Sequence, residues 1–314
     1  MNTRKQKLVA FGECMVELRR VEEGLMRQAF GGDTLNTAVY LARLAGGAFD
    51  VAYASALGDS DSFSDAMLAS WAAEGIDTGF VERRAGELPG LYTIEVDASG
   101  ERRFAYWRQH SAARNYFASD ASPLERRAAE IDLLYLSGIS LAILPQAGRD
   151  RLFALIDWLR AKGARFVFDN NYRPRLWSSA DEARQTYAAA YARADIALVT
   201  LSDEMEVQSI ADEAQAIEFA CALPCREVVI KRGASPTLVR AIDGSRTEVA
   251  TEPVPTVVDT TAAGDSFGAG YLAARLHGLG AAQAAAVGNR LAAAVIQCPG
   301  AIIPRERMPA ALLA

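Results

Sequence analysis

The pattern of apolar and polar positions along the chain alternates between two kinds of segment. Short apolar, β-branched runs are typical of buried strands, and longer segments with apolar residues at helical spacing are typical of amphipathic helices. The predicted strands are 8–12, 51–58, 133–138, 165–171, 196–201 and 227–233. The predicted helices are 34–47, 63–74, 146–162, 265–277 and 281–297. This alternation predicts an α/β fold with a doubly wound, mostly parallel sheet and helices on both faces.

One segment breaks the alternation. In GLYTIEVDASGERRFAYWR (90–108), apolar and polar residues alternate on both sides of DASG (97–100), which predicts an antiparallel hairpin with its turn there. A hairpin inserted into a parallel α/β protein is expected to stand outside the central sheet as a lid. Tyr92, Tyr106 and Arg108 could then point toward a ligand. The alternative is that the aromatic side chains of the hairpin pack on the body.

Length and composition are those of a globular protein with a sizeable core. The chain has 314 residues, of which 51% are hydrophobic and 23% are charged. The formal net charge is -6, which disfavours binding to nucleic acid or to an anionic membrane surface. We therefore expect neither partner, and an anionic ligand must be held by local groups.

No segment is typical of a targeting signal or a membrane span. The first apolar run is short, is interrupted by Gly12 and Glu13, and lacks a cleavage site, so it predicts a strand. The apolar region 281–298 contains Asn289 and Arg290, which favours a buried helix. The four cysteines are too few for a disulfide framework in a chain of this length. We expect a cytoplasmic protein with ordinary thiols.

Polar residues and glycines follow the predicted strands, at the edge where open α/β sheets bind ligands. In FGGDTLN (30–36), Gly32 allows a ligand to approach the backbone, and Asp33 and Asn36 place polar groups at the start of a helix. The alternative interpretation of this stretch is an ordinary turn followed by a helix cap.

Two further strand ends carry cationic side chains. In FDNNYRPRLW (168–177), Arg173 could clamp an anionic group in a bidentate geometry. In VVIKRGASP (228–236), Lys231 and Arg232 come at the end of the strand. None of the lysines follows a G-x-x-x-x-G pattern and no G-x-G-x-x-G is present, which excludes a Walker-A loop and a dinucleotide fingerprint.

The stretch DTTAAGDSFGAGY (259–271) combines two acids with a run of small residues. If a helix begins near Ala263, its free backbone N–H groups and positive dipole end form an anion site that small side chains leave uncovered. Asp265 would lie in the first turn, where a carboxylate can accept a proton from a hydroxyl that attacks phosphorus. The alternative, a helix capped by acids, explains Asp265 but not the run of small residues. These are Thr260, Ala262, Ala263 and Gly264.

Three of these motifs together resemble a known family. DTTAAGDSFGAG is similar to the second signature of the ribokinase-like (phosphofructokinase B) sugar kinases, usually D-T-x-G-A-G-D. FGGDTLNTA resembles the glycine-rich first signature, and FDNNYR matches the D-x-N-x-R element. Order and spacing fit over essentially the whole chain. The resemblance implies a single ribokinase-like α/β domain over 1–314, with a small β-rich lid from about 12–30 and 87–110.

Within this family, six segments resemble members that act on a keto-deoxy sugar acid, among them GECMVEL, YLSGISLAIL and GAIIPRE. The resemblance implies ATP-dependent phosphorylation of 2-keto-3-deoxy-D-gluconate at O6 in sugar-acid catabolism. It implies Mg²⁺ as cofactor and leaves a monovalent cation open. The alternatives are a kinase of another sugar, such as fructose or a nucleoside, and a non-catalytic sugar-acid sensor.

The resemblance also implies roles for individual residues. The general base would be Asp265, with an anion hole formed by the backbone of Ala262, Ala263 and Gly264. The substrate would be bound by Gly32, Asp33, Asn36, Tyr92, Tyr106, Arg108, Arg173 and Asp259. The nucleotide would be bound by Asn171, Lys231, Arg232, Gly233 and Gly264. Magnesium would be assisted by an acid in 203–206, with Glu204 as the candidate.

The sequence departs from the family pattern at three places. The N-x-x-E element, which helps to place magnesium in the family, is not clean, because TLSDEME (200–206) offers Asp203, Glu204 and Glu206. Ala262 replaces the first glycine of G-A-G-D, where a methyl group is tolerated unless φ is positive. Pro236 stands where glycine is common. A homo-oligomer formed through the lid and the choice between gluconate and galactonate epimers both stay open.

Overall fold

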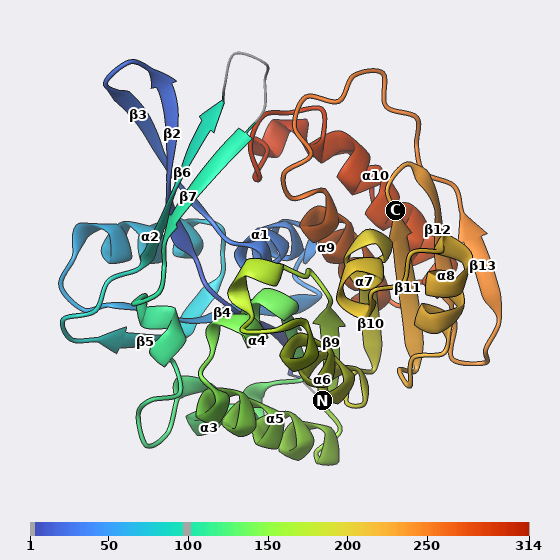
Figure 1. Cartoon of the computed structure of the whole chain (residues 1–314), viewed down its shortest axis with the longest axis horizontal. Helices are drawn as coiled ribbons and strands as arrows, with labels where there is room; N and C mark the ends of the chain where they lie inside the picture. Colours follow the sequence, from blue (N-terminus) through green and yellow to red (C-terminus); the bar gives the residue numbers. More distant parts are fainter. Residues whose placement is uncertain (1–3, 97–101, 314) are drawn as a thin grey trace.

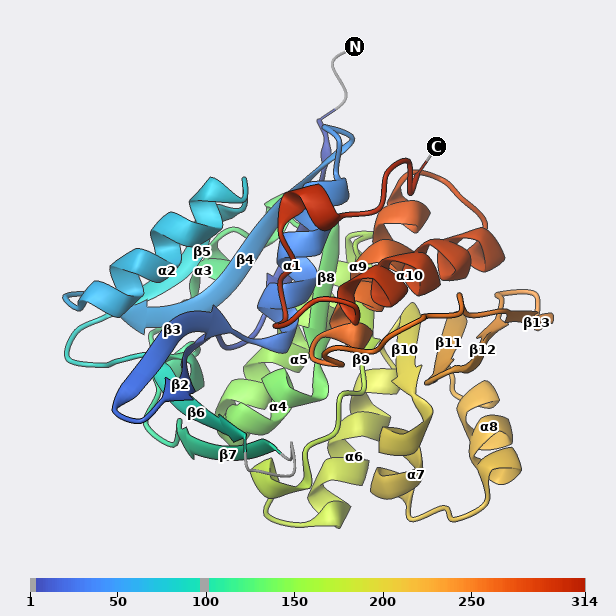
Figure 2. The ribbon, with the colours of Figure 1, turned by 90° about the horizontal axis from the view of Figure 1, so that it is seen from above.

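A computed structural model describes residues 4–96 and 102–313; the turn predicted at 97–100 lies outside the described residues. A nine-stranded sheet runs through the molecule, with helices on both of its faces, and a separate four-stranded sheet stands beside it (Figures 1 and 2). The predicted α/β fold is therefore confirmed.

The large sheet has the strand order β13-β12-β11-β10-β9-β8-β1-β4-β5. Its first seven strands along the chain are β1 (Gln6–Phe11), β4 (Phe49–Gly58), β5 (Asp77–Arg84), β8 (Leu133–Ser137), β9 (Arg165–Asp169), β10 (Ile196–Thr200) and β11 (Glu227–Arg232). These seven pair in parallel. At the edge, β12 (Ser235–Arg240) and β13 (Arg246–Val249) pair antiparallel. Strands β8, β9 and β10 are almost wholly buried, as expected of parallel strands covered on both faces.

Two hydrophobic cores lie on the two faces of this sheet. One core packs the sheet against α1 (Asp33–Leu44), α2 (Ser62–Ala73), α9 (Ala263–Leu276) and α10 (Ala281–Val295). The other packs it against α4 (Gly138–Ile143), α5 (Gln146–Ala161), α6 (Ala180–Tyr191), α7 (Leu201–Gln208) and α8 (Glu213–Cys221). The shorter helices are α3 (Pro123–Arg126) and single 3₁₀ turns at Ala112–Asn115, Ala128–Glu130, Pro174–Leu176 and Arg305–Arg307. The sheet is thus doubly wound.

The small sheet has the order β3-β2-β6-β7 and is built from β2 (Met15–Glu22), β3 (Leu25–Gly31), β6 (Gly90–Val96) and β7 (Arg102–Trp107). β6 and β7 pair antiparallel, as the alternation predicts, and β2 joins them by parallel pairing with β6. Figure 1 shows this sheet rising at one side of the central sheet, close to the start of α1.

All five predicted helices and all six predicted strands of the large sheet are present, with ends that differ by a few residues. Within the described ranges, no helix is both long enough and apolar enough to cross a lipid bilayer.

Candidate active site

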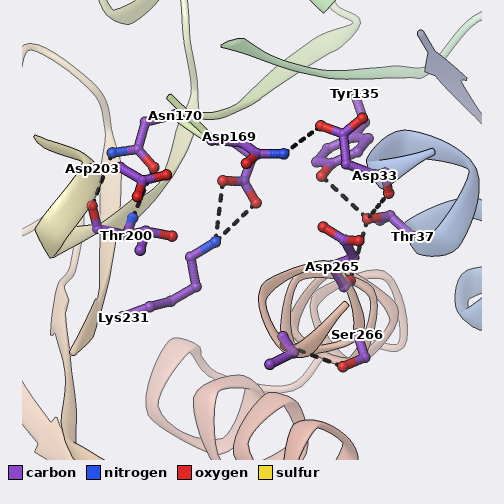
Figure 3. Close-up of polar contacts among 12 residues, drawn as sticks. Asp33, Thr37, Tyr135, Asp169, Asn170, Thr200, Asp203, Lys231, Asp265 and Ser266 are labelled. Carbon is purple, nitrogen blue, oxygen red and sulfur yellow. Dashed lines mark hydrogen bonds and ion pairs between the residues drawn. The ribbon is translucent and has the colours of Figure 1, made fainter. Parts of the chain in front are cut away.

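The polar residues singled out in the sequence gather at the carboxyl end of the large sheet. Asp169 is the last residue of β9, Lys231 lies near the end of β11, and Asp33 opens α1. Asp265 lies in the first turn of α9. Figure 3 shows these four side chains around one space. They meet there because the carboxyl ends of parallel strands and the first turns of the following helices lie at the same edge of the sheet.

The start of α9 has an unusual backbone. Its N-cap, Ala262, adopts φ 61° and ψ 17°, in the left-handed region, and no side chain caps the helix. The N–H of Ala263 donates to the carbonyl of Thr260 at 3.2 Å. The N–H groups of Gly264 and Asp265 belong to the first turn, which has no carbonyl partners within a helix. The positive end of the helix dipole is therefore open to an anion.

Asp265 lies in surroundings that disfavour its charge. Its carboxylate accepts a hydrogen bond from Asn36 Nδ2 at 2.8 Å, and its backbone carbonyl accepts one from Thr37 Oγ1 at 3.2 Å. Burial, followed by the nearby charge of Asp33, raises the pKa of Asp265 to about 7, against the lowering effect of the Asn36 bond. A carboxyl group of this kind changes protonation near neutral pH.

Lys231 and Asp169 form a buried ion pair beside this carboxylate. Lys231 Nζ donates to both oxygens of Asp169, at 3.1 and 2.9 Å. Burial raises the pKa of Asp169 despite the charge of Lys231. Sequence reasoning did not select Asp169, although an acid at the end of an apolar strand was a signal for it.

A hydrogen bond between Asp33 and Asn171 connects the start of α1 with the segment that follows β9. Asn171 Nδ2 donates to Asp33 Oδ2, and Asn171 itself has a positive φ of 22°. Asn171, predicted to lie along the nucleotide, is thus in contact with a residue predicted for the sugar. Asn36 Oδ1 is buried and accepts no hydrogen bond from the described residues.

Asp259 is bound to the backbone around it. One carboxylate oxygen accepts from the N–H of Thr261 at 2.8 Å, and the other accepts from the N–H of Gly300 at 2.9 Å. The carboxylate therefore fastens the turn before α9 to the segment that follows α10.

Two of the three side chains predicted to point from the lid, Arg108 and Tyr92, are already paired with acids. Arg108 forms an ion pair with Glu13, which is 2% exposed, and Tyr92 donates its hydroxyl proton to Glu17. Tyr106 stacks on Tyr92 with ring centroids 5.7 Å apart and is 49% exposed. Sequence reasoning missed Glu13 and Glu17 as partners, although both lie in the GECMVEL segment.

Two predicted cations lie at the margin of the site. The Arg173 side chain is 54% exposed and pairs with Asp203 at 3.3 Å. Arg232 donates to the carbonyl of Pro236 and to the carboxylate of Glu248, both at 2.7 Å. Its guanidinium group is therefore bound to β12 and β13. Between Arg232 and Pro236, the chain turns at Gly233, which has a φ of 62°.

Glu204 is fully buried and accepts hydrogen bonds from the side chains of Tyr191, Asn170 and Gln208. Burial raises its pKa. In the part of the chain that the structure describes, no group of three or more His, Cys, Asp or Glu side chains could hold a metal ion. A magnesium ion that is bound together with a nucleotide keeps water and phosphate oxygens as most of its ligands and does not require such a group.

Comparisons with known proteins show which proteins this chain is similar to. The chain is similar to 2-dehydro-3-deoxygluconokinase of Dickeya dadantii (strain 3937), with 49% identity over 97% of this chain and 99% of the relative. It is 47% identical to 2-dehydro-3-deoxygluconokinase of Escherichia coli (strain K12), over 97% of this chain and 99% of that protein.

The fold is also found in solved structures. Aminoimidazole riboside kinase from Salmonella enterica, complexed with aminoimidazole riboside and an ATP analogue, superposes with a TM-score of 0.79 at 23% identity. The match covers 94% of this chain and 95% of that one. The pattern of the pfkB family carbohydrate kinases matches residues 5–308. The chain belongs to the pfkB family of carbohydrate kinases.

Proposed function

We propose that this chain transfers the γ-phosphoryl group of ATP to O6 of 2-keto-3-deoxy-D-gluconate, giving ADP and 2-keto-3-deoxy-6-phosphogluconate in sugar-acid catabolism. The substrate follows from the two relatives at 49% and 47% identity, both 2-dehydro-3-deoxygluconokinases. The observation that carries the chemistry is the Asp265 carboxyl, with its pKa near 7, beside the open N–H groups of α9.

Asp265 is the general base of this proposal. It takes the proton of the O6 hydroxyl as that oxygen bonds to the γ-phosphorus, while the bond from phosphorus to the β–γ bridging oxygen breaks. A base whose pKa lies near the working pH is both available as carboxylate and able to hold the proton.

The start of α9 is the anion hole. The N–H groups of Gly264 and Asp265 bind the phosphoryl oxygens, while Ala262 and Ala263, whose N–H is bonded to Thr260, shape the turn, and the helix dipole adds to the effect. Such fixed donors need no reorganisation as charge moves in the transition state. The side chains along this turn are small enough to leave the backbone accessible.

The sugar lies against the start of α1. Gly32, Asp33 and Asn36 line its pocket, and the unpaired Asn36 Oδ1 is an acceptor for a sugar hydroxyl. A side chain at position 32 would collide with the carbonyl of Glu13, since a Cβ there would lie 2.1 Å from it. Asp259 acts on the sugar through the turn that it fastens.

The lid is the small sheet, which belongs to the two segments at about 12–30 and 87–110. Tyr92, Tyr106 and Arg108 from the lid and Arg173 from the body recognise the acid end of the substrate. Guanidinium groups suit this role because they bind a carboxylate in a bidentate geometry.

The nucleotide lies along the opposite side of the site. Its phosphates approach Asn171, Lys231 and Gly264, and the turn at Gly233 with Arg232 borders the rest. Magnesium would bind together with the nucleotide, and Glu204 would act on it only through the side chains of Tyr191, Asn170 and Gln208. Bound magnesium screens the charge of the phosphates.

The test is the reaction itself. The purified chain is incubated with Mg·ATP and 2-keto-3-deoxygluconate, ADP is followed in a coupled assay, and the product is examined by phosphorus–proton NMR. We expect ADP release and a phosphate ester coupled to the C6 protons. Absence of ADP release, or an ester at another carbon, would refute the proposal.

A further inference from the structure

Lys231 is a lysine with very little contact with solvent. Its side chain is 10% exposed and that of its partner Asp169 is 4% exposed. Removing both charges from water costs more free energy than such a pair commonly returns, so a buried ion pair is weak evidence for a role in stability. A pair of this kind at the ligand-binding edge of the sheet calls for a functional explanation.

The ammonium group of Lys231 keeps one donor for a ligand. An ammonium has three N–H donors, and two of them point to Asp169 Oδ1 and Oδ2. Among residues 4–96 and 102–313, no other acceptor receives a hydrogen bond from Lys231 Nζ.

The ammonium group lies beside the start of α9. A Cβ built on Gly264 would lie 3.5 Å from Lys231 Nζ, so the ammonium borders the first turn of the helix (Figure 3). This is the same turn whose N–H groups of Gly264 and Asp265 have no helical partners. An anion held by that turn would lie within hydrogen-bonding reach of Lys231.

The charge balance of the site gives Lys231 a task. The carboxylates of Asp33, Asp169 and Asp265 surround the space, and their mutual repulsion contributes to the raised pKa of Asp265. The neighbouring cation, Arg232, is bound to Pro236 and Glu248 instead. A phosphoryl group entering this space needs a cation beside it, and Lys231 is in place.

We propose that Lys231 is a catalytic residue that donates its third N–H to a non-bridging oxygen of the transferring phosphoryl group, and that Asp169 is the residue that positions it. The proposal rests on the proposed function and assigns a task within it. As O6 bonds to phosphorus, the bond to the bridging oxygen breaks and its electron pair leaves with ADP. The O6 proton goes to Asp265, and Lys231 keeps all its protons. Its hydrogen bond strengthens as charge spreads over the equatorial oxygens.

The first variant is Lys231→Met, which keeps the length of the side chain and removes its charge. We expect kcat to fall about 10²–10³-fold, the usual scale for one lost electrostatic donor, with KM for the sugar acid changed less than about threefold. Lys162→Met, at an exposed lysine on the surface, is the matched control and should keep wild-type kcat.

The second variant, Asp169→Asn, tests the positioning role. We expect a fall in kcat of about tenfold, because the ammonium keeps one acceptor but loses the charge that fixes it. In Lys231→Met/Asp169→Asn, kcat should match that of Lys231→Met within about threefold, since Asp169 acts only through Lys231. An independent structural role for Asp169 predicts multiplied losses instead.

The double variant also guards against misfolding, because it removes both buried charges together. All variants are checked by thermal melting and assayed with whichever sugar the wild-type chain phosphorylates, so a wrong substrate assignment does not affect the result. Near-wild-type kcat in folded Lys231→Met, or in the double variant if the single one does not fold, would overturn the inference. The loss described above would support it.

Discussion

The proposed phosphate end and the proposed sugar-acid end of the site place their charges differently. At the phosphate end, the N–H groups of α9 lack helical partners, and Lys231 keeps a donor beyond its bonds to Asp169. At the sugar-acid end, on the lid, Arg108 is bound to a buried glutamate, and Tyr92 is bound to Glu17. The phosphate end thus has unpaired donors that can bind an anion, whereas the positive charge of Arg108 at the sugar-acid end is neutralised by Glu13.

This difference in pairing matches the different tasks proposed for the two ends, which are catalysis at the phosphate end and substrate selection at the sugar-acid end. Donors held on the ends of helices and strands are fixed before the substrate arrives, as electrostatic catalysis requires. A lid arginine that is paired with Glu13 offers its charge to a substrate carboxylate only against the attraction of that acid. If Arg108 binds the substrate as proposed, discrimination between acids and neutral sugars depends on the competition of Glu13 and the substrate carboxylate for its guanidinium.

The largest expected effect is that of Asp265→Asn. The amide cannot take the O6 proton, so we expect turnover to fall about 10²–10⁴-fold while sugar-acid binding, measured by calorimetry, persists. The variant should also be more stable than wild type above pH 7. The raised pKa of Asp265 stabilises the fold at low pH, and this stabilisation is lost as pH rises through about 7. Near-normal turnover would remove Asp265 from the mechanism.

The next effect concerns the lid. Arg108→Met alone would leave Glu13 buried without a partner, so the change is made in a Glu13→Gln background. We expect KM for the sugar acid to rise about 10–100-fold relative to Glu13→Gln, the worth of one hydrogen bond to a charged group, with little change for a neutral sugar. Glu13→Gln alone should lower KM for the acid, because Arg108 gains unopposed charge. Equal losses for acid and neutral sugars would make Arg108 structural.

A moderate effect is expected from pH. Asp265 acts as a base only as carboxylate, so kcat/KM should rise about tenfold per pH unit up to about 7 and level off above it. Asp33→Asn removes a charge that raises the pKa of Asp265, and the acid limb should therefore move to lower pH. A pH profile whose limb stays in place in this variant would show that Asp33 does not influence the base.

The smallest effect is expected from Ala262→Gly. At φ 61°, alanine is strained by about 1–2 kcal/mol, and glycine relieves the strain but adds about 0.4–1 kcal/mol of unfolded-state entropy. Stability measured by urea unfolding should rise by about 1 kcal/mol or less, and turnover should stay within about twofold. A large loss of turnover would mean that the methyl group itself shapes the anion hole.

Much of the body could be predicted because its signals are local. Strands such as β8 and β10 are buried on both faces and are therefore continuous apolar runs, and the helices repeat apolar residues at helical spacing. The start of α9 was recognisable because small residues there have no packing explanation. By contrast, β3 is largely exposed and its residues LMRQA carry no strand pattern, so it was found only through the family resemblance.

The pairing of side chains could not be predicted in the same way. Lys231 and Arg232 are neighbours in one strand, and their side chains leave it on opposite faces, which sequence alone does not assign. The structure directs Lys231 to Asp169 and Arg232 to Glu248. The bonds of Arg108 to Glu13 and of Asp259 to Gly300 join segments far apart in the chain, so they arise only from the tertiary fold.

The most direct test of the whole account is a comparison of kcat/KM for 2-keto-3-deoxygluconate, gluconate, fructose and ribose, with saturating Mg·ATP at pH 8. The account predicts efficient turnover of the keto-deoxy acid alone. Turnover only of a neutral sugar would contradict the role given to the lid arginine, and turnover of none of the four would contradict the proposed kinase activity.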